Sequence, residues 1–483
     1  MKGKYKMKLS ELIKNVKCKN IISEHLNPEI TGVRYNSNKV EKGNLFVAVK
    51  GYKTDGHKYI KSAVENGAAA VICEERQDDL AVPQIIVENS RIAEAVVSAE
   101  MFSNPSKNLK LIGITGTNGK TTCTYLVKQI LESNGYKCGL IGTNQNMIGD
   151  TVLETGRTTP DSYELQELFA KMSSQNCDYV IMEVSSHALE LDRVYGCEFE
   201  VGAFTNLTQD HLDFHKTMDN YAKAKSKLFS MSKKSVINAD DKYADVMIKG
   251  ASDYITYGIN ENADIKAENI EYSARGVAFN ADNTNYYLGI PGSFSVYNAL
   301  CAIAIAKSVG IDDVNAAKAL KCAHGVKGRA EIVPTDTDYT VMIDYAHTPD
   351  GLENILNTVR GFAKGRVVVV FGCGGDRDNT KRPIMGEIAS KLADFAVVTS
   401  DNPRSENPMK IIEMIEQGIK TNKTPYVIIE NRKEAIKYAL ENAQKDDVIV
   451  LAGKGHETYQ ILAEGTIHFD EREAVRDILN KNN

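Results

Sequence analysis

A glycine-rich segment in the first third of the chain has the residue types that hold nucleotide phosphates. It comprises Gly116, Thr117, Asn118, Gly119, Lys120, Thr121 and Thr122. Glycines let backbone N–H groups approach phosphate oxygens, a lysine pairs with the phosphate charge, and a threonine hydroxyl is a ligand for Mg²⁺. An apolar run precedes the segment and a helical pattern follows it, so we predict a strand, a phosphate loop for ATP and Mg²⁺, and a helix. Ile114 replaces the first glycine of the usual pattern, and the competing interpretation is a turn that binds nothing.

Two later loops and a helix carry further candidates. Glu183 follows the apolar run 178–182, where a nucleotide-binding sheet places an acidic group for Mg²⁺. The alternative for Glu183 is a carboxylate that stabilises a helix start. His211 follows the run 201–204 and is a candidate for metal or phosphate binding, with helix capping as the alternative. Lys225 lies in the helical pattern 221–229, which we interpret on its own as carrying a solvated lysine.

The last third of the chain repeats this arrangement with charged loops. Strand-like runs ending near residues 343, 371, 399 and 451 are each followed by polar residues. These loops contain Arg377, Lys381, Arg382, Arg404, Asp344, Asp376 and Glu457. An arginine fork recognises a carboxylate, and a carboxylate holds an ammonium group, so the loops favour a zwitterionic amino acid. Structural salt bridges are the alternative for any single pair.

The elements that must position these residues form more than one domain, because 483 residues exceed one hydrophobic core. We predict an α/β protein with a small mixed α/β N-terminal domain (1–106), a central P-loop mononucleotide-binding domain (107–328) and a C-terminal Rossmann-like domain (329–483). Helices between the strands make both large sheets parallel, which gathers the candidate loops at their carboxyl edges. Alternation in 252–291 predicts an antiparallel patch, and the segment 325–331 has the composition of a hinge.

Composition excludes several classes of protein. The net charge of −6 argues against a nucleic-acid-binding surface, and no apolar run is long enough to span a bilayer. Nine cysteines without a C-x-x-C pair favour a reducing compartment, with neither a disulfide framework nor a zinc site. We therefore expect a cytoplasmic protein, and we expect it to be a monomer.

Several motifs, in order, resemble those of the Mur ligases of peptidoglycan synthesis. They are Gly116–Thr121, Glu183–His187, Asp210–Asp213, Ala224–Lys225, Gly328–Glu331 and Gly453–Glu457. Within this family, Asp401–Arg404 is similar to the motif of members that add meso-diaminopimelate, whereas lysine-adding members lack the arginine. The resemblance implies an ATP-dependent ligase that adds meso-diaminopimelate to UDP-N-acetylmuramoyl-L-alanyl-D-glutamate through an acyl phosphate. The alternatives are a lysine-adding ligase, a folylpolyglutamate synthetase-like ligase, and a nucleotide-gated switch or motor.

The resemblance also implies roles for individual residues. Lys225 matches a carbamylated lysine that helps to hold a second Mg²⁺, so the implied metal ligands are Thr121, Glu183, His211 and Lys225. ATP would also contact Asn298 and Arg329. The UDP-linked substrate would contact Ser37, Thr158, Thr159, Ser185 and Arg193. The amino acid would contact Arg377, Asp401, Asn402, Pro403, Arg404, Gly453 and Glu457. The first-domain motif of the family is usually Asp-Ser-Arg but is Asn36–Asn38 here, which limits what the resemblance implies about uridine contacts.

Overall fold

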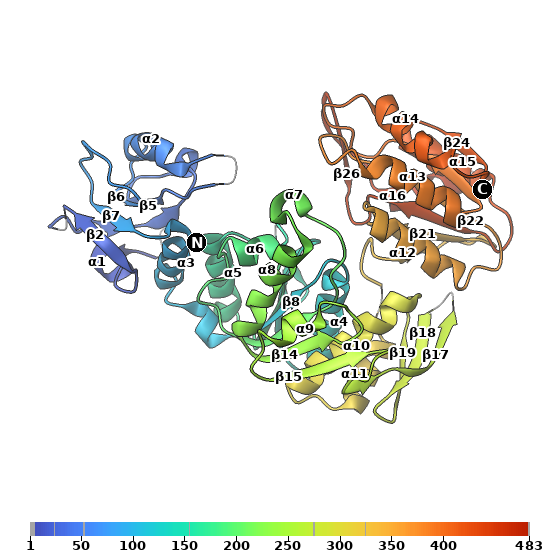
Figure 1. Cartoon of the computed structure of the whole chain (residues 1–483), viewed down its shortest axis with the longest axis horizontal. Coiled ribbons are helices and arrows are strands. Elements are labelled where there is room, and N and C mark those ends of the chain that lie inside the picture. Colours follow the sequence, from blue (N-terminus) through green and yellow to red (C-terminus); the bar gives the residue numbers. More distant parts are fainter. Residues whose placement is uncertain are drawn as a thin grey trace.

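The computed structural model describes residues 5–23, 25–51, 54–153, 155–273, 276–323 and 325–481. Figure 1 shows three lobes that follow one another along the chain, from the blue N-terminal lobe through the central one to the orange and red C-terminal lobe. The predicted α/β architecture of three domains is confirmed, while the exact domain boundaries at residues 106 and 328 stay predictions. Within the described residues, no helix combines the length and the apolar character needed to cross a membrane.

The N-terminal lobe is built on a five-stranded sheet of order β2-β7-β6-β5-β4, in which only β2 is antiparallel to its neighbour. Its strands are β2 (Cys18–Ile22), β4 (Gly32–Arg34), β5 (Asn44–Val47), β6 (Ala70–Cys73) and β7 (Gln84–Val87). Two short strands, β1 (Met7–Lys8) and β3 (Glu29–Ile30), pair separately. The helical elements are α1 (Leu9–Leu12), η1 (Ser37–Lys39), η2 (Gly56–Tyr59), α2 (Ile60–Glu65), α3 (Ser90–Met101) and η3 (Pro105–Asn108).

The central lobe contains a nine-stranded sheet of order β11-β10-β9-β12-β8-β13-β14-β15-β16. In this spatial order, the seven strands β9, β12, β8, β13, β14, β15 and β16 run parallel, as the sequence predicts. β10 and β11 add an antiparallel edge. The parallel strands are β8 (Lys110–Thr115), β9 (Cys138–Ile141), β12 (Tyr179–Glu183), β13 (Phe199–Phe204), β14 (Ser232–Asn238), β15 (Tyr254–Gly258) and β16 (Ile265–Lys266). The edge strands are β10 (Asn146–Ile148) and β11 (Thr151–Leu153).

Helices cover both faces of this sheet, which explains why its inner strands are apolar throughout rather than alternating. They are α4 (Lys120–Ser133), α5 (Ser162–Ser174), α6 (Ser186–Glu190), α7 (Leu212–His215), α8 (Met218–Ser230), α9 (Ala244–Ile248), α10 (Ser293–Ser308) and α11 (Asp313–Lys321). Helix α10 is buried from Ser295 to Ala306 on almost every face, apart from the partly exposed Tyr297. Its apolar character all round is typical of a helix enclosed by other elements.

The predicted antiparallel patch is present but begins later than the sequence pattern indicates. Strands β17 (Glu268–Ser273), β18 (Gly276–Ala281) and β19 (Thr284–Leu288) form an antiparallel three-stranded sheet. β15, which also lies in the predicted range, joins the parallel sheet through β14 instead. Short strands at a sheet edge have too little periodicity to separate the two arrangements.

The C-terminal lobe is a second sheet of order β20-β21-β25-β22-β23-β24, parallel except for β20. Its strands are β20 (Glu331–Val333), β21 (Thr340–Asp344), β22 (Val367–Phe371), β23 (Phe395–Val398), β24 (Tyr426–Ile428) and β25 (Val448–Ala452), with a hairpin of β26 (Tyr459–Leu462) and β27 (Gly465–His468). Its helices are α12 (Pro349–Arg360), α13 (Lys381–Leu392), α14 (Pro408–Ile419), α15 (Arg432–Glu441) and α16 (Glu471–Lys481). The carboxyl ends of β21, β22, β23 and β25 carry the charged loops that the sequence singled out.

Candidate functional site

The glycine-rich segment is a tight loop between β8 and α4, as predicted. Gly119 has a left-handed backbone (φ +85°), and a Cβ atom there would lie 2.5 Å from Oδ1 of Asn298. At Gly116 a Cβ would lie 1.8 Å from Oγ1 of Thr205. Neither position has room for a side chain, so the backbone lies against its neighbours as a phosphate-binding loop requires. The short distance at Gly119 also shows that Asn298 of α10, a predicted ATP contact, lies directly beside the loop.

Lys120 is the first residue of α4 and folds back over the loop. Its Nζ donates hydrogen bonds to the carbonyl oxygens of Gly116 (2.8 Å) and Thr117 (2.7 Å). Burial lowers the pKa of Lys120, nearby Glu183 raises it, and the positive charge of Arg329 lowers it further. Carbonyl oxygens are neutral acceptors, so the Lys120 ammonium has no anionic partner in these two bonds. A bound phosphate group would supply one.

Glu183 ends β12 and faces the first turn of α4. Oε1 of Glu183 accepts hydrogen bonds from Oγ1 of Thr121 (2.9 Å) and from the backbone N–H of Thr143 (2.9 Å). The Thr143 hydroxyl donates to Oε2 at 3.0 Å. The two predicted metal ligands, Thr121 and Glu183, are therefore in contact, whereas Thr143 had no sequence signal beyond its place after β9.

These oxygen donors fit Mg²⁺, which prefers carboxylate and hydroxyl oxygens and completes its shell with water and phosphate. Among the described residues, no group of three or more His, Cys, Asp or Glu side chains gathers in a way that could hold a metal ion. A divalent ion at Thr121 and Glu183 would therefore take most of its ligands from the nucleotide and from water. All nine cysteines are unbridged, as the sequence predicts.

Lys225 is buried in α8, so the solvated lysine expected from its helical pattern is wrong. The residue is 1% exposed, and its Nζ donates a 2.8 Å hydrogen bond to the carbonyl oxygen of Gly116. Its Nζ also lies 4.6 Å from the centroid of the Tyr221 ring. Burial and the neighbouring charge of Lys120 lower the pKa of Lys225 well below its usual value. A neutral amine beside the phosphate loop is the form that can react with carbon dioxide.

His211 lies beside the same loop but is more exposed. It has a left-handed backbone (φ 53°), and its ring centroid lies 4.8 Å from that of His187. Its Nε2 lies 3.3 Å from Oδ2 of Asp210. The ring centroids of His211 and Tyr221 are 6.3 Å apart, which places His211 next to the helix that carries Lys225.

Four of the five residues predicted to contact the UDP-linked substrate form a hydrogen-bonded group next to Glu183. Thr158 bonds Thr143 through their hydroxyls (3.0 Å), and Thr159 donates to the carbonyl oxygen of Glu183 (2.9 Å). The backbone N–H of Ser185 donates to the Thr159 hydroxyl at 3.0 Å, and Nη1 of Arg193 donates to the Thr159 carbonyl at 3.1 Å.

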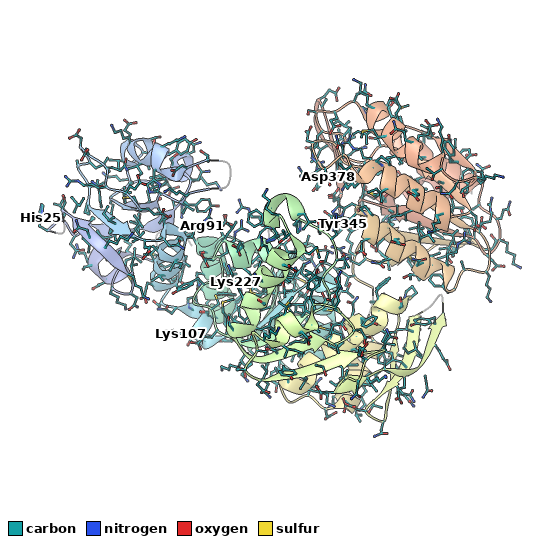
Figure 2. The ribbon with its side chains drawn as sticks, in the orientation of Figure 1. His25, Arg91, Lys107, Lys227, Tyr345 and Asp378 are labelled. Atoms are coloured by element: carbon teal, nitrogen blue, oxygen red, sulfur yellow. The ribbon has the colours of Figure 1, made fainter. Side chains whose placement is uncertain are left out.

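Ser37, the fifth, belongs to the N-terminal lobe. It lines a cavity of about 480 Å³ that reaches across to Arg193 in the central lobe. Tyr35 and Asp161, for which the sequence carried no signal, bond across this boundary: the Tyr35 hydroxyl donates to Oδ2 of Asp161 at 2.5 Å. Within the central lobe, Nε of Arg193 pairs with Oδ1 of Asp161 at 2.8 Å. A neighbouring cavity of about 750 Å³ is lined by Arg91 and Lys227 from the two lobes (Figure 2).

The C-terminal loops form a second cluster. Nδ2 of Asn402 donates to Oε2 of Glu457 at 2.9 Å, and the fully buried Lys454 donates to the same oxygen at 3.0 Å. A Cβ atom at Gly453 would lie 2.6 Å from Oδ2 of Asp401. The sequence pointed to this motif through its charges and through its resemblance to a known family, but the role of Lys454 as a partner of Glu457 was missed.

The arginines of this cluster separate into two kinds. Nη1 of Arg404 donates to the Gly375 carbonyl at 2.9 Å, and a Cβ at Gly374 would lie 2.9 Å from that nitrogen and 3.9 Å from Cγ of Arg377. A Cβ at Gly375 would lie 1.9 Å from the Pro403 carbonyl oxygen, so the two loops interlock. Arg382 instead is 1% exposed and forms a two-point ion pair with Glu406, so it is structural rather than a pocket residue.

The phosphate loop is in direct contact with the C-terminal lobe. Oδ2 of Asp350, at the start of α12, accepts hydrogen bonds from Asn118 Nδ2 (2.6 Å) and Thr208 Oγ1 (3.0 Å). Arg329 lies 4.8 Å over the ring of Tyr345, which Figure 2 labels at this boundary. The arrangement has the parts of an enzyme that activates one group with a nucleotide and delivers a charged amino acid to it.

Comparison with known proteins agrees with this geometry. The family model for the Mur ligase family, catalytic domain, matches residues 29–111. The models for the Mur ligase middle domain and for the Mur ligase, glutamate ligase domain, match residues 114–306 and 328–455.

Similar proteins cover the whole chain. A UDP-N-acetylmuramoyl-L-alanyl-D-glutamate–2,6-diaminopimelate ligase of Clostridium acetobutylicum is 55% identical over 98% of this chain and 100% of its own length. A solved structure of a ligase with that description matches with a TM-score of 0.70 and 32% identity over 99% of both chains. A folylpolyglutamate synthase of Mycobacterium tuberculosis matches with a TM-score of 0.63 at 17% identity over 75% of this chain and 92% of its own, and shares the fold alone.

Proposed function

This chain belongs to the Mur ligase family, and we propose that it joins meso-diaminopimelate to UDP-N-acetylmuramoyl-L-alanyl-D-glutamate with hydrolysis of ATP. The product is a precursor of peptidoglycan. The observation that carries this function is that the phosphate loop contacts the C-terminal lobe, which carries the charged loops, through the bonds of Asp350 in α12 to Asn118 and Thr208.

The first step is activation of the D-glutamate side-chain carboxylate. One carboxylate oxygen attacks the γ-phosphorus of ATP, the bond from that phosphorus to the β-phosphate oxygen breaks, and ADP and an acyl phosphate result. Lys120 and the N–H groups of the loop would hold the phosphates, with Thr121 and Glu183 as the residues that would hold Mg²⁺. Bound Mg²⁺ would neutralise part of the phosphate charge. Thr158, Thr159, Ser185 and Arg193 would position the muramoyl dipeptide so that its carboxylate reaches the phosphate.

The second step forms the amide bond. The amine of meso-diaminopimelate, after losing a proton, attacks the acyl carbon, and the bond from that carbon to the phosphate oxygen breaks to release phosphate. Arg404 and Arg377 would grip the distal carboxylate and Glu457 an ammonium group, so that one amine alone reaches the acyl carbon. Loops on two lobes can exclude water from the acyl phosphate when the lobes close.

Two features separate this function from its alternatives. The Asp401–Arg404 loop supplies an arginine that can bind the distal carboxylate of meso-diaminopimelate. The amino acid lysine has no such carboxylate. The two lobes with nucleotide-type sheets form a site for small molecules, whereas a nucleotide-gated switch would need a macromolecular partner. We also propose that the chain acts as a monomer in the cytoplasm, a reducing compartment that suits its nine unbridged cysteines.

A coupled assay tests the function. Phosphate release from ATP is measured with the UDP-muramoyl dipeptide, with meso-diaminopimelate, and with both. We expect release only when both are present, together with a product whose mass rises by that of one diaminopimelate residue. Release with either substrate alone at the full rate, or equal turnover of lysine, would overturn the assignment.

A further inference from the structure

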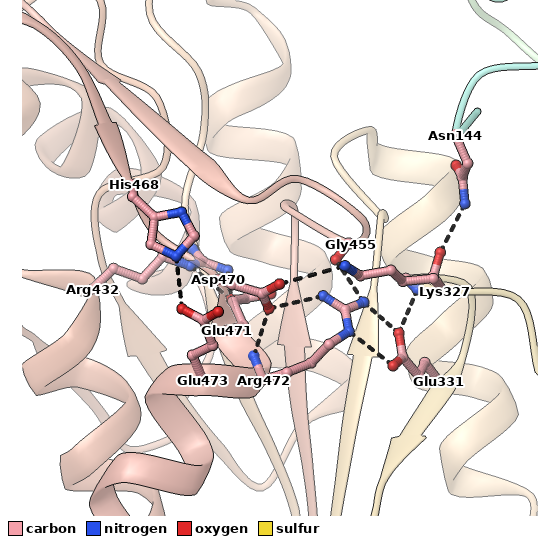
Figure 3. A network of polar contacts seen from close by, with 11 residues as sticks. Asn144, Lys327, Glu331, Arg432, Gly455, His468, Asp470, Glu471, Arg472 and Glu473 are labelled. Carbon is pink, nitrogen blue, oxygen red and sulfur yellow. Dashed lines mark hydrogen bonds and ion pairs between the residues drawn. The ribbon is translucent and has the colours of Figure 1, made fainter. Parts of the chain in front are cut away.

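A network of polar contacts joins the segment between the central and C-terminal lobes to the loop that carries Glu457 (Figure 3). At its centre is Arg472, in the first turn of α16, whose side chain is 13% exposed. Nε of Arg472 donates to Oε1 of Glu331 at 2.8 Å, and Nη2 donates to the second oxygen of the same carboxylate. Nη2 also donates to the carbonyl oxygen of Gly455 at 3.1 Å, and Nη1 to Oδ1 of Asp470 at 3.1 Å. One guanidinium therefore holds two segments of chain that are far apart in sequence.

The first of these segments, 327–331, links the two lobes. It packs directly against the second segment, the loop 453–457. Oε2 of Glu331 accepts a 2.6 Å hydrogen bond from the backbone N–H of Gly328. Gly328 has a left-handed backbone (φ +71°), and a Cβ atom there would lie 2.1 Å from the backbone nitrogen of His456. The backbone N–H of Tyr345 donates to the Gly328 carbonyl at 2.9 Å. These contacts tie the segment to the C-terminal lobe, as does the ion pair of Lys327 with Asp470 (3.5 Å).

Arg329 lies inside this segment, with its guanidinium 4.8 Å from the centroid of the Tyr345 ring. Its Nε is buried and has no hydrogen-bond partner among the described residues, as expected of a donor whose partner is a ligand. On the other side of the boundary, Nδ2 of Asn144 in the central lobe donates to the Lys327 carbonyl at 2.9 Å. Asn144 follows Thr143, the residue that holds Glu183. The segment therefore connects the metal and phosphate region with the amino-acid loop.

We propose that Arg472 is a positioning residue that fixes the amino-acid loop and Arg329 relative to each other, so that the acyl phosphate forms only where the amine can reach it. This role rests on the proposed function. Arg472 does not touch the substrates; it acts through Glu331 and Gly455. Without Arg472, the loop 453–457 and the segment 327–331 would lose their shared anchor, and water would hydrolyse part of the acyl phosphate before the amine attacks.

The test measures phosphate released per amide bond formed in Arg472→Met and in Glu331→Gln, with both substrates present. We expect this ratio to rise clearly above the value of one expected for the wild type, and the rate of amide formation to fall about 10- to 100-fold, as for small misplacements of reacting groups. Arg472→Lys keeps the charge but not the two-point geometry, and its ratio should lie between those of the wild type and Arg472→Met. Glu331→Gln carries the test if Arg472→Met fails to fold.

Arg366→Met is the matched control. Arg366 forms a similar two-point pair with Asp447 in the same lobe, with Nε 3.1 Å and Nη2 2.6 Å from Oδ2, but at the opposite edge of the sheet where β22 and β25 begin. Its loss should lower the unfolding temperature and leave the ratio at one. A ratio of one in both Arg472→Met and Glu331→Gln, or an equal rise in Arg366→Met, overturns the proposal. Absence of amide product from the wild type would instead refute the ligase function.

Discussion

The side-chain nitrogens of Lys120 and Lys225 share one acceptor, the carbonyl oxygen of Gly116, which lies 2.8 Å from each. Lys225 is buried and Lys120 is half-buried, and two positive charges at one oxygen repel each other. Burial and this neighbouring charge lower the pKa of Lys225 well below its usual value. The neutral amine that results is the reactive form for capture of carbon dioxide, and the anionic carbamate would remove the repulsion.

Lys225→Ala should therefore lower kcat about 10²- to 10³-fold, the loss seen when one fixed electrostatic group is removed from an active site. Added bicarbonate should not restore activity. In the wild type, ¹³C-labelled bicarbonate should give a carbamate resonance that the variant lacks. Lys233→Ala, which removes an exposed lysine paired with Glu200, serves as control and should behave as the wild type. Near-normal turnover of Lys225→Ala would refute the carbamate role.

Glu183→Gln should raise the Mg²⁺ concentration needed for half-maximal activity and lower kcat by about 10²-fold. The amide can still accept a hydrogen bond from Thr121, so the loop geometry is kept while the negative charge is lost. Titration of activity with Mg²⁺ measures the effect, with Glu200→Gln as a surface control. An unchanged Mg²⁺ dependence would show that Glu183 is a structural carboxylate.

Arg404→Ala should raise KM for meso-diaminopimelate about 10- to 100-fold, because one charge-assisted contact to the distal carboxylate is lost. KM for ATP should stay within error, since the arginine lies in the other cluster. The preference for diaminopimelate over lysine should shrink by a similar factor. Arg360→Ala is the control, because that arginine pairs with Asp394 on the outer side of the lobe. A constant KM for meso-diaminopimelate would exclude Arg404 from the pocket.

Glu94→Gln should stabilise the protein at pH 8 but not at pH 5. Glu94 is 7% exposed, Oε1 has no hydrogen-bond partner among the described residues, and burial raises its pKa to about 8 from an ordinary 4.5. Between pH 4.5 and about pH 8 the folded state therefore binds more protons than the unfolded state. The free energy of unfolding thus falls as the pH rises from 4.5 to about 8. The cost of the charge at pH 8 is on the order of 4 kcal/mol at most.

Thermal unfolding of Glu94→Gln, followed at both pH values, measures this effect. The exposed Glu164 supplies the control Glu164→Gln, which should change the unfolding temperature little at either pH. Equal shifts of Glu94→Gln at pH 5 and pH 8 would mean that the Glu94 carboxyl ionises normally in the folded protein.

The sequence predicted the phosphate loop well because its signal is local. Gly116, Gly119, Lys120 and Thr121 lie within one turn, and glycine is required there by contacts with Thr205 and Asn298. The placement of Thr121 and Glu183 at one edge of the sheet also followed from its parallel strands, since parallel strands end at one edge. These features need no knowledge of distant side-chain packing.

Lys225 shows a signal that was present but outweighed by residue type. It lies four residues after Tyr221 and four before Phe229, both buried, so helical spacing places it on the apolar face of α8. Because lysines are rarely buried, the residue type led to the prediction of a solvated Lys225 side chain.

Other features depended on contacts that no local pattern reveals. The sequence pattern places Arg382 and Arg404 in similar charged loops, but in the structure Arg382 lies in α13 and pairs with Glu406. The bonds from Arg472 to Glu331 join residues 141 positions apart.

Transfer of an oxygen atom tests the central claim most directly. The D-glutamate side-chain carboxylate of the UDP-linked substrate is labelled with ¹⁸O, and the released phosphate is analysed by mass spectrometry after turnover with ATP and meso-diaminopimelate. If the carboxylate attacks the γ-phosphate, each phosphate carries one ¹⁸O atom from the substrate. Phosphate without the label would contradict an acyl phosphate and with it the proposed mechanism.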